Sequence, residues 1–439
     1  MKTDVPKQTA VPATGGRATR GTRIRFRVAA LGTTLAMVTY LDRVSMGTIA
    51  PIVTREWQLT PSQTGWIFSA FALAYAIFEI PTAKWAEKLG TKSVLTRIVL
   101  WWSAFTAATA LAFNLPSMLL VRFLFGAGEA GAWPMAARAF SSWIPRLERG
   151  TVQGIFFAGA HLVGGLTPPL IGLMLVYMSW RTTFMVFGLI GLLWVAAWRK
   201  WFVNDPTDHP EVDAAELAHI LHGRPPDSKH TVGREYWGRL FFSRNVVLLC
   251  LMYLSNSTIF YFCITWLPTY LKNRHGFDAS TLGFLSGLPL LVSVPSDLFG
   301  GRLSDQLCAK YGMRVGRCYL GAVAYALTSA FLFLAASSST PIVAAVAIAT
   351  ATGLTMLTLG AAWGTCIEVA RNHAGVVGAV MNTSGQVASL LIPLVVGYSV
   401  EWFNNWDFPI YMLACMFLVG TICWLLIDPY KPVFDEHAT

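Results

Sequence analysis

Charged residues are scarce in this sequence. Only 13% of its 439 residues are Asp, Glu, Lys or Arg, whereas 54% are hydrophobic. Soluble domains carry about 25% charged residues, so the composition excludes an ordinary soluble protein. The net charge of +10 is compatible with a nucleic-acid partner. However, the basic residues collect in alternate loops between apolar segments, which is the distribution of a membrane protein, and we expect no nucleic-acid partner.

Two sequence motifs are also missing. The seven cysteines all lie in the second half of the chain and none forms a Cys-x-x-Cys pair. They therefore suggest neither a metal site nor a disulfide framework, and we interpret them as small apolar fillers. No Gly-x-x-x-x-Gly-Lys-Ser/Thr loop is present, which argues against ATP as an energy source. We expect no enzyme activity, no metal and no cofactor.

Long apolar runs dominate what is present. Twelve of them are long enough to cross about 30 Å of hydrocarbon. They lie near residues 28–51, 63–84, 93–113, 115–139, 150–175, 181–202, 245–271, 281–304, 315–337, 341–364, 374–398 and 406–427. Inside lipid only helices and closed barrels satisfy the backbone, and runs of this length are helices. The sequence thus predicts an all-α membrane protein with twelve transmembrane helices.

Polar stretches divide the chain into two halves. Residues 1–27 are a basic tail that we expect to be disordered. Residues 203–244 are a polar linker between six-helix bundles at 28–202 and 245–428, and a short tail covers 429–439. No small-residue cleavage site is evident, so the first apolar run is interpreted as a retained helix rather than a secretory signal.

The basic residues fix the expected orientation. Of the 33 Lys and Arg, two lie within helices, four lie in loops on one side (Arg55, Arg181, Lys272 and Arg274), and the remaining 27 lie on the other side. Basic loops face the cytoplasm. We therefore expect both termini to be cytoplasmic in a multi-pass protein of the inner, or plasma, membrane of a bacterium.

Two pairs of charges fall inside the apolar segments at 28–51 and 115–139. Arg122 and Glu129 are seven residues apart and share one helix face, and Asp42 and Arg43 are adjacent in the first segment. An ionised side chain at a bilayer centre costs about 2.5–3.5 kcal/mol by insertion scales. Such groups face a bundle interior or a wet cavity, so we interpret the four as an anion site with a proton relay beside it. The alternative is a pair of buried salt bridges that only hold helices together.

The two halves repeat one charged motif. Glu87 and Lys88 follow the second helix, and Arg302 and Asp305 follow the eighth. Charges at a helix end can pair with a neighbouring helix terminus, so we interpret both copies as a cytoplasmic gate and assign Asp297 to the second copy. The alternative is ordinary turn charges. Internal repeats with a midplane site between them are typical of secondary transporters.

Seven motifs together carry a resemblance to a known family. They are Tyr40-Leu-Asp42-Arg43, Tyr75, Arg122-Phe-Leu-Phe-Gly-Ala-Gly-Glu129 with Pro134, Trp180-Arg181-x-x-Phe184, Asp205-Pro206 with His209-Pro210, Trp266-Leu-Pro-Thr-Tyr270-Leu271 and Met381-Asn382-Thr-Ser384-Gly385. In them the chain resembles the major facilitator superfamily over nearly all of residues 28–428. Within it the chain is similar to the anion:cation symporters, which include carriers of hexonates, hexuronates, aldarates and tartrate.

The resemblance implies roles for the four buried charges. Arg43 and Arg122 would hold a substrate carboxylate, while Asp42 and Glu129 would carry coupling protons. Independently, the arginine fork matches a carboxylate. Polar side chains elsewhere are further candidates for substrate contact, with interhelical hydrogen bonds or a satisfied core histidine as the alternatives. These candidates are Tyr75, His161, Asn256, Ser257, Asn382 and Ser384.

These observations predict a monomeric secondary transporter that imports a small organic anion, such as a sugar acid, together with protons. Two alternatives stay open: an anion exchanger or uniporter of the same fold without proton coupling, and a membrane sensor of the anion. The sequence departs from the family pattern at Ala83, Glu87, Glu79 and Glu368. We therefore infer no particular substrate.

Overall fold

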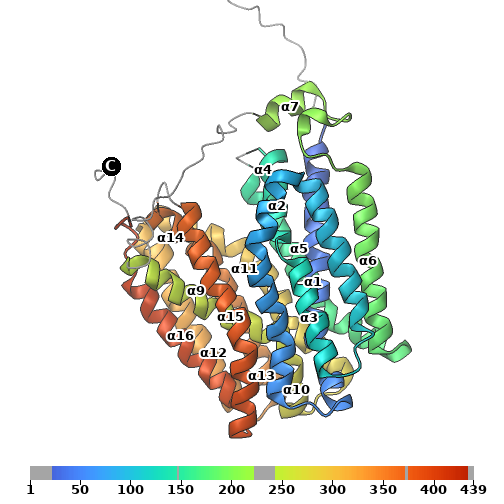
Figure 1. The fold of residues 1–439 in the computed structure, drawn as a ribbon. Coiled ribbons are helices and arrows are strands. Elements are labelled where there is room, and N and C mark those ends of the chain that lie inside the picture. The colour runs from blue at the N-terminus through green and yellow to red at the C-terminus, as the bar shows by residue number, and fades with distance from the viewer. Residues whose placement is uncertain (1–21, 146–147, 222–242, 371–373, 434–439) are drawn as a thin grey trace, which may run out of the picture.

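The computed structural model describes residues 22–145, 148–221, 243–370 and 374–433, and within these ranges all regular elements are helices (Figure 1). The first bundle contains α1 (Ile24–Glu56), α2 (Pro61–Thr109), α3 (Leu115–Glu129), α4 (Ala132–Trp143), α5 (Arg149–Tyr177) and α6 (Trp180–Trp201). The second contains α9 (Arg244–Thr265), α10 (Leu267–His275), α11 (Ala279–Tyr311), η2 (Arg314–Tyr319), α12 (Leu320–Ser337), α13 (Pro341–Leu357), α14 (Leu359–Ala370), α15 (Ala374–Phe403) and α16 (Phe408–Leu426).

In the described ranges, nine helical stretches are long and apolar enough to cross a membrane. The other three expected crossings are the two arms of α2 and the pair α3–α4. Both have a glycine at their break: Gly90 has φ +76° within α2, and Gly131 has φ +89° between α3 and α4. A left-handed backbone is accessible to glycine at little cost. The chain can therefore turn at these two points where a residue with a side chain would be strained.

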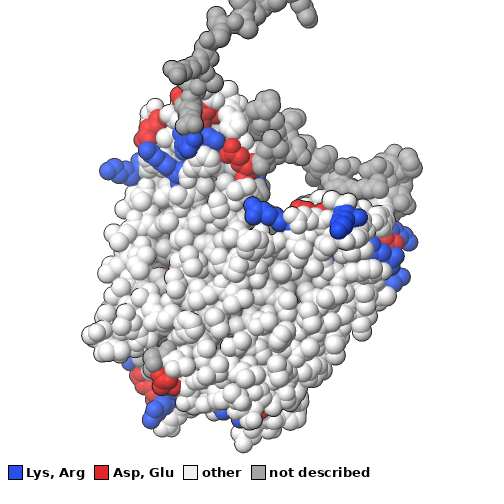
Figure 2. Space-filling view, turned by 180° about the vertical axis from the view of Figure 1, so that it is seen from behind, with Lys and Arg blue, Asp and Glu red and all other residues white. Residues whose placement is uncertain are grey.

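The outer surface supports a lipid environment. Large apolar side chains are exposed, among them Phe113, Val176, Leu193 and Trp402. Figure 2 shows that the middle of the visible face has almost no charged residues and that Lys, Arg, Asp and Glu gather towards its two ends. An apolar belt between charged ends is what a multi-pass membrane protein presents to a bilayer.

The two bundles meet mainly along two helix pairs, α5 with α11 and α2 with α15. At Gly287 of α11, an added Cβ would collide with the carbonyl of Gly165 on α5, and at Gly65 of α2 it would collide with the carbonyl of Pro393 on α15. These contacts lie in the half of the molecule away from α7 (Ala214–Leu221). We call that half the far end and the opposite half the α7 end. The bundles are thus in backbone contact at the far end.

The polar segment after α6 folds onto the first bundle. It forms η1 (Pro206–Asp208) and α7, so the first part of the expected linker is ordered. The buried Glu216 carboxylate accepts hydrogen bonds from the Ile24 and Arg25 amides at the start of α1, at 3.0 and 3.1 Å, and from the Thr22 hydroxyl at 2.5 Å. Arg25 binds both Glu216 and Glu148, the residue preceding α5. We call this group of five residues the α7 clasp.

The clasp is expected to stabilise the first bundle. Glu216→Gln removes a charged acceptor from free amides at a helix N-terminus, where a carboxylate is favoured. Loss of charge-assisted bonds costs about 1.5–3 kcal/mol. The melting temperature in detergent should therefore fall by roughly 3–12 °C, at about 2–4 °C per kcal/mol. Glu211→Gln is the matched control, because Glu211 pairs with Arg27 on the exposed surface and its loss should change little. Equal melting temperatures for the two variants would contradict this role.

The clasp should also respond to acid. The hydrogen bond from Arg25 holds the pKa of the Glu148 carboxyl below its usual range. A carboxyl whose pKa is lower in the folded state stabilises that state above its unfolded pKa of about 4.3. The contribution is lost as the pH falls through the lowered value.

Candidate functional site

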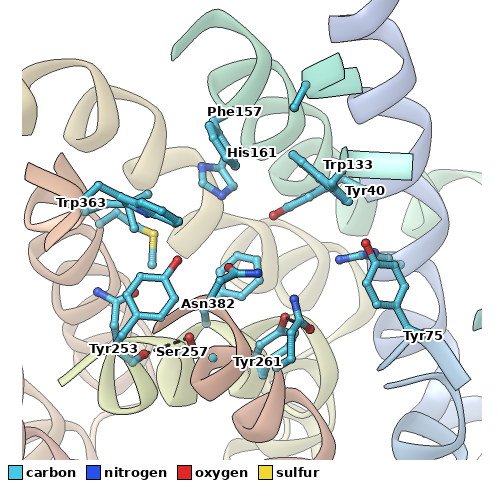
Figure 3. A pocket seen from close by; sticks show the side chains of 18 of the residues that line it. Tyr40, Tyr75, Trp133, Phe157, His161, Tyr253, Ser257, Tyr261, Trp363 and Asn382 are labelled. Carbon is cyan, nitrogen blue, oxygen red and sulfur yellow. Dashed lines mark hydrogen bonds between the residues drawn. The ribbon is translucent and has the colours of Figure 1, made fainter. Parts of the chain in front are cut away.

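One cavity of about 610 Å³ lies between the two bundles. Its walls come from α1, α2, α4 and α5 on one side and from α9, α13, α14 and α15 on the other (Figure 3). Its lining residues include Gln153, which lies one turn from the start of α5, so the cavity extends towards the α7 end. A pocket of this size suits a small molecule.

Arg43 is the guanidinium that lines this cavity. Its Nε donates a hydrogen bond of 2.5 Å to Glu129 Oε1, and the Glu129 side chain is almost completely buried. The Arg43 Cζ atom lies 5.0 Å from the ring centre of Tyr75 and 5.3 Å from that of Phe71. Within the described residues, its two terminal nitrogens form no hydrogen bond. Arg43 is therefore held from behind, with a fork of donors available to a ligand.

Arg122 and Asp42 are placed differently. Both are buried, and neither lines the cavity. Arg122 Cζ lies 4.6 Å from the Phe125 ring centre, and in the described part of the chain neither residue forms an ion pair. Together with Glu129 they form a layer of buried charged residues on the side of Arg43 away from the cavity. The structure thus brings the four predicted charges into one region but gives only Arg43 direct access to the cavity.

The second bundle contributes most of its predicted polar residues. Asn382, Asn256 and Ser257 line the cavity, and Tyr75 faces it from the first bundle. The Asn256 amide also donates to the Thr355 carbonyl at 3.3 Å. Ser384 is not among the lining residues, and its hydroxyl donates to the Met381 carbonyl within its own helix at 2.6 Å.

His161 faces the cavity from α5 and connects the two bundles. Its Nδ1 lies 2.5 Å from Oδ2 of Asp297 on α11, and both side chains are buried. The rings of Tyr40 and Phe260 pack beside it, with ring centres 5.5 and 5.9 Å away. Asp297, which the sequence suggested for the gate, therefore contacts a residue of the cavity wall, although it does not itself line the cavity.

The predicted gate residues of the second half lie together only in part. Asp305 pairs with Arg317 at 3.0 Å, and Arg317 also contacts Glu368 at 3.4 Å, all within the second bundle. Arg302 is exposed. The side chains of Glu87 and Lys88 lie outside the described residues. The gate role of these residues stays a prediction.

Sequence reasoning did not single out most of the aromatic wall. Trp133, Phe157, Tyr253 and Tyr261 line the cavity, as does Gln386, whose Oε1 accepts from the Tyr261 hydroxyl at 3.4 Å. Aromatic residues are spread through every apolar run of this chain, so their presence in a segment does not reveal which of them face a cavity. Glu79 also lines it and was visible in the sequence as an acidic residue within an apolar run.

Comparison with known proteins decides the family. A model of the Major Facilitator Superfamily matches residues 33–393. The chain belongs to this superfamily. A probable sulfoacetate transporter of Cupriavidus necator is 34% identical over 95% of this chain and 97% of its own length. A probable galactarate/D-glucarate transporter of Escherichia coli is 28% identical over 93% of this chain and 95% of its own.

A solved structure confirms the fold of this facilitator. A bacterial homologue of the human lysosomal transporter Spinster, in an inward-facing and unoccupied conformation, superposes with a TM-score of 0.70 at 18% identity, covering 92% of this chain and 95% of that one. The predicted all-α major facilitator fold is thus confirmed. The chain is a membrane transporter related to carriers of sugar acids and other organic anions.

Proposed function

We propose that this transporter moves a small organic anion, of the sugar-acid or related carboxylate class, together with protons. The observation that carries this is the geometry of Arg43. It faces the cavity with two unengaged terminal nitrogens, and a buried carboxylate on α3 holds its Nε. Parallel donors of a guanidinium match the two oxygens of a carboxylate. The names of the two relatives, both carriers of acids, support the same class.

Proton binding is coupled to anion binding because Glu129 and the anion compete for Arg43. With the cavity empty, Glu129 is the partner of that guanidinium. A bound carboxylate draws on the same positive charge, which lowers the stabilisation of ionised Glu129 and favours its protonation. Anion and proton then bind with positive coupling, and the coupling is reciprocal. Asp42 lies in the same buried layer and is the second candidate proton carrier.

Transport itself is proposed to occur by rocking of the two bundles. The backbone contacts close the far end, and the cavity extends towards the α7 end. Breaking those contacts while closing the α7 end would expose the same site to the other side, as expected for alternating access. Of the 33 basic residues, 27 fall in one set of alternate loops and tails of the sequence. By the positive-inside rule this distribution supports cytoplasmic termini in an inner membrane, with α7 on the same side.

An anion panel tests the substrate class. The purified protein should gain thermal stability with galactarate, galactonate, sulfoacetate or glycolate, because a ligand that binds only the native state stabilises it by mass action. Galactitol is the matched neutral control, since it has the carbon skeleton of galactonate without the carboxylate. No shift with any anion across millimolar concentrations, or an equal shift with galactitol, would contradict the proposed class.

Proton coupling is tested separately. Proteoliposomes loaded with buffer should accumulate the best ligand of the panel when an inward proton gradient is imposed. An exchanger would require a preloaded anion, and a uniporter would only equilibrate the ligand. Either of these outcomes would replace symport with the corresponding alternative, while leaving the substrate class intact.

A further inference from the structure

The His161–Asp297 pair is a buried acid–base pair that the Arg43 mechanism does not use. Its two members come from different bundles, across the α5–α11 contact. Asp297 Oδ1 is buried without a hydrogen-bond partner, and among the described residues His161 is the only partner of this carboxylate. Among the described residues no hydrogen bond engages His161 Nε2, and the ring faces the cavity that Arg43 and Tyr75 also line (Figure 3).

Electrostatics constrains the protons of this pair. An ionised carboxylate in an apolar interior is costly unless a cation or several donors compensate it. In the described part of the chain, Asp297 has no Lys or Arg within ion-pair distance, so the imidazole is the group that can supply the positive charge. A carboxylate bonded to Nδ1 also fixes which ring nitrogen carries the proton and how the ring is oriented. The pair therefore favours a proton on Nδ1 and leaves Nε2 to interact with whatever occupies the cavity.

We propose that Asp297 is a positioning residue that holds His161 as an imidazolium, so that Nε2–H becomes a second cationic donor in the cavity. The inference rests on the proposed function and deepens it. Arg43 binds one anionic group of the substrate, and His161 donates a hydrogen bond to a second anionic group on the same molecule. The preferred substrates are then dianions, such as dicarboxylates or sulfocarboxylates, rather than monoanions of the same length.

Other titratable groups face the same cavity and have to be separated from this effect. They come from α1, α2 and α9, whereas Asp297 of α11 contacts His161 without lining the cavity. They are Tyr40, Arg43, Tyr75, Glu79, Tyr253 and Tyr261. Because all of them act on a dianion and on a monoanion bound at Arg43, a ratio of two affinities largely cancels their contribution. What remains in the ratio is the interaction with the second anionic group.

The test compares matched ligands. Galactarate and galactonate differ only in a carboxylate that replaces a hydroxymethyl group, and sulfoacetate and glycolate differ in a sulfonate that replaces a hydroxyl. Dissociation constants are measured by calorimetry in detergent for the wild type, Asp297→Asn and His161→Gln. A hydrogen bond to a charged group is worth about tenfold or more in affinity. In both variants the preference for the dianion should fall by about that factor, while binding of the monoanion changes by less than about threefold.

Asp305→Asn is the control variant, because it makes the same chemical change on the same helix at an exposed carboxylate that meets Arg317. Its affinity ratio should equal that of the wild type. In the wild type, raising the pH from 5.5 to 8.5 should weaken the dianion preference, because loss of the imidazolium proton would remove the second cationic donor. This measurement needs no variant and therefore does not depend on whether Asp297→Asn folds.

Several outcomes would overturn the inference. One is a wild-type preference for the monoanions. Others are a ratio of dissociation constants that is unchanged in folded Asp297→Asn and His161→Gln, or that does not vary with pH in the wild type. An equal loss of affinity for both ligands of a pair would make His161 and Asp297 purely structural. If the wild type binds no member of either pair, the proposed function itself fails. The two failures are therefore distinguishable.

Discussion

Arg43→Lys should abolish measurable uptake while the protein still inserts and folds. The guanidinium binds Glu129 with Nε and presents its two terminal nitrogens to the cavity. A lysine ammonium is a point charge and cannot do both in one fixed geometry. Each charge-assisted hydrogen bond is worth about 1.5–3 kcal/mol. Two lost contacts therefore correspond to a fall of about 100-fold or more in affinity for the anion, at about 1.4 kcal/mol per factor of ten.

The measurement is ligand binding in detergent, followed by uptake in proteoliposomes. Arg27→Lys is the matched control, because Arg27 is exposed and, among the described residues, its one ion pair is with Glu211. This control should transport like the wild type. Uptake at the wild-type rate by Arg43→Lys would contradict the assignment of Arg43 as the anion-binding residue. Arg122→Lys is informative in parallel: Arg122 does not line the cavity, so if it acts only through the buried carboxylates, this variant should retain ligand binding better than Arg43→Lys does.

Glu129→Gln should separate anion exchange from proton-driven accumulation. The amide is close to a protonated carboxyl in shape, and its oxygen can still accept the hydrogen bond from Arg43 Nε. The guanidinium then stays oriented, but no proton can be gained or released at this site. Counterflow in preloaded proteoliposomes should therefore persist. Uptake driven by an imposed proton gradient should fall to the level of passive equilibration, and ligand binding should depend less on pH.

Two results would change this interpretation. If Glu129→Gln still accumulates the anion against its gradient, the coupling proton is carried elsewhere, with Asp42 and then His161 as the next candidates. If a folded Glu129→Gln loses counterflow as well, Glu129 is a structural partner of Arg43 rather than a proton carrier. Asp42→Asn, tested in the same two assays, distinguishes one coupling proton from two.

The sequence was sufficient to predict the fold because the bilayer imposes a strong constraint. Length and apolarity of a run decide whether it crosses hydrocarbon, and both can be read from residues alone. The positions of the helix breaks were harder to predict from the sequence. Gly90 and Gly131 adopt positive φ values, whereas Gly126 and Gly128 lie inside α3. A glycine in an apolar run has either role depending on what packs against it, and that is a tertiary property.

The site was predictable to the extent that charge inside lipid marks it. Arg43, Glu129, Asp42 and Arg122 were identified by this criterion and do lie in one region. Which of them face the cavity depends on how α1 and α3 are rotated, and a seven-residue spacing does not fix that rotation. The contact of Asp297 with His161 was not predictable for a similar reason: Asp297 is eight residues from Asp305 on one helix, and only the packing of α5 against α11 brings it to His161.

The α7 clasp changes where the first bundle ends. A fragment cut at residue 202, at the end of the sixth transmembrane helix, would lack the Glu216 carboxylate that caps α1. Several donors at the first turn of α1 would then have no acceptor. A fragment that continues to residue 221 keeps that acceptor. In a split version of the transporter, the longer fragment should therefore be the one that assembles with the second half. During synthesis, the first turn of α1 likewise has no carboxylate acceptor until Glu216 is made, almost 200 residues later.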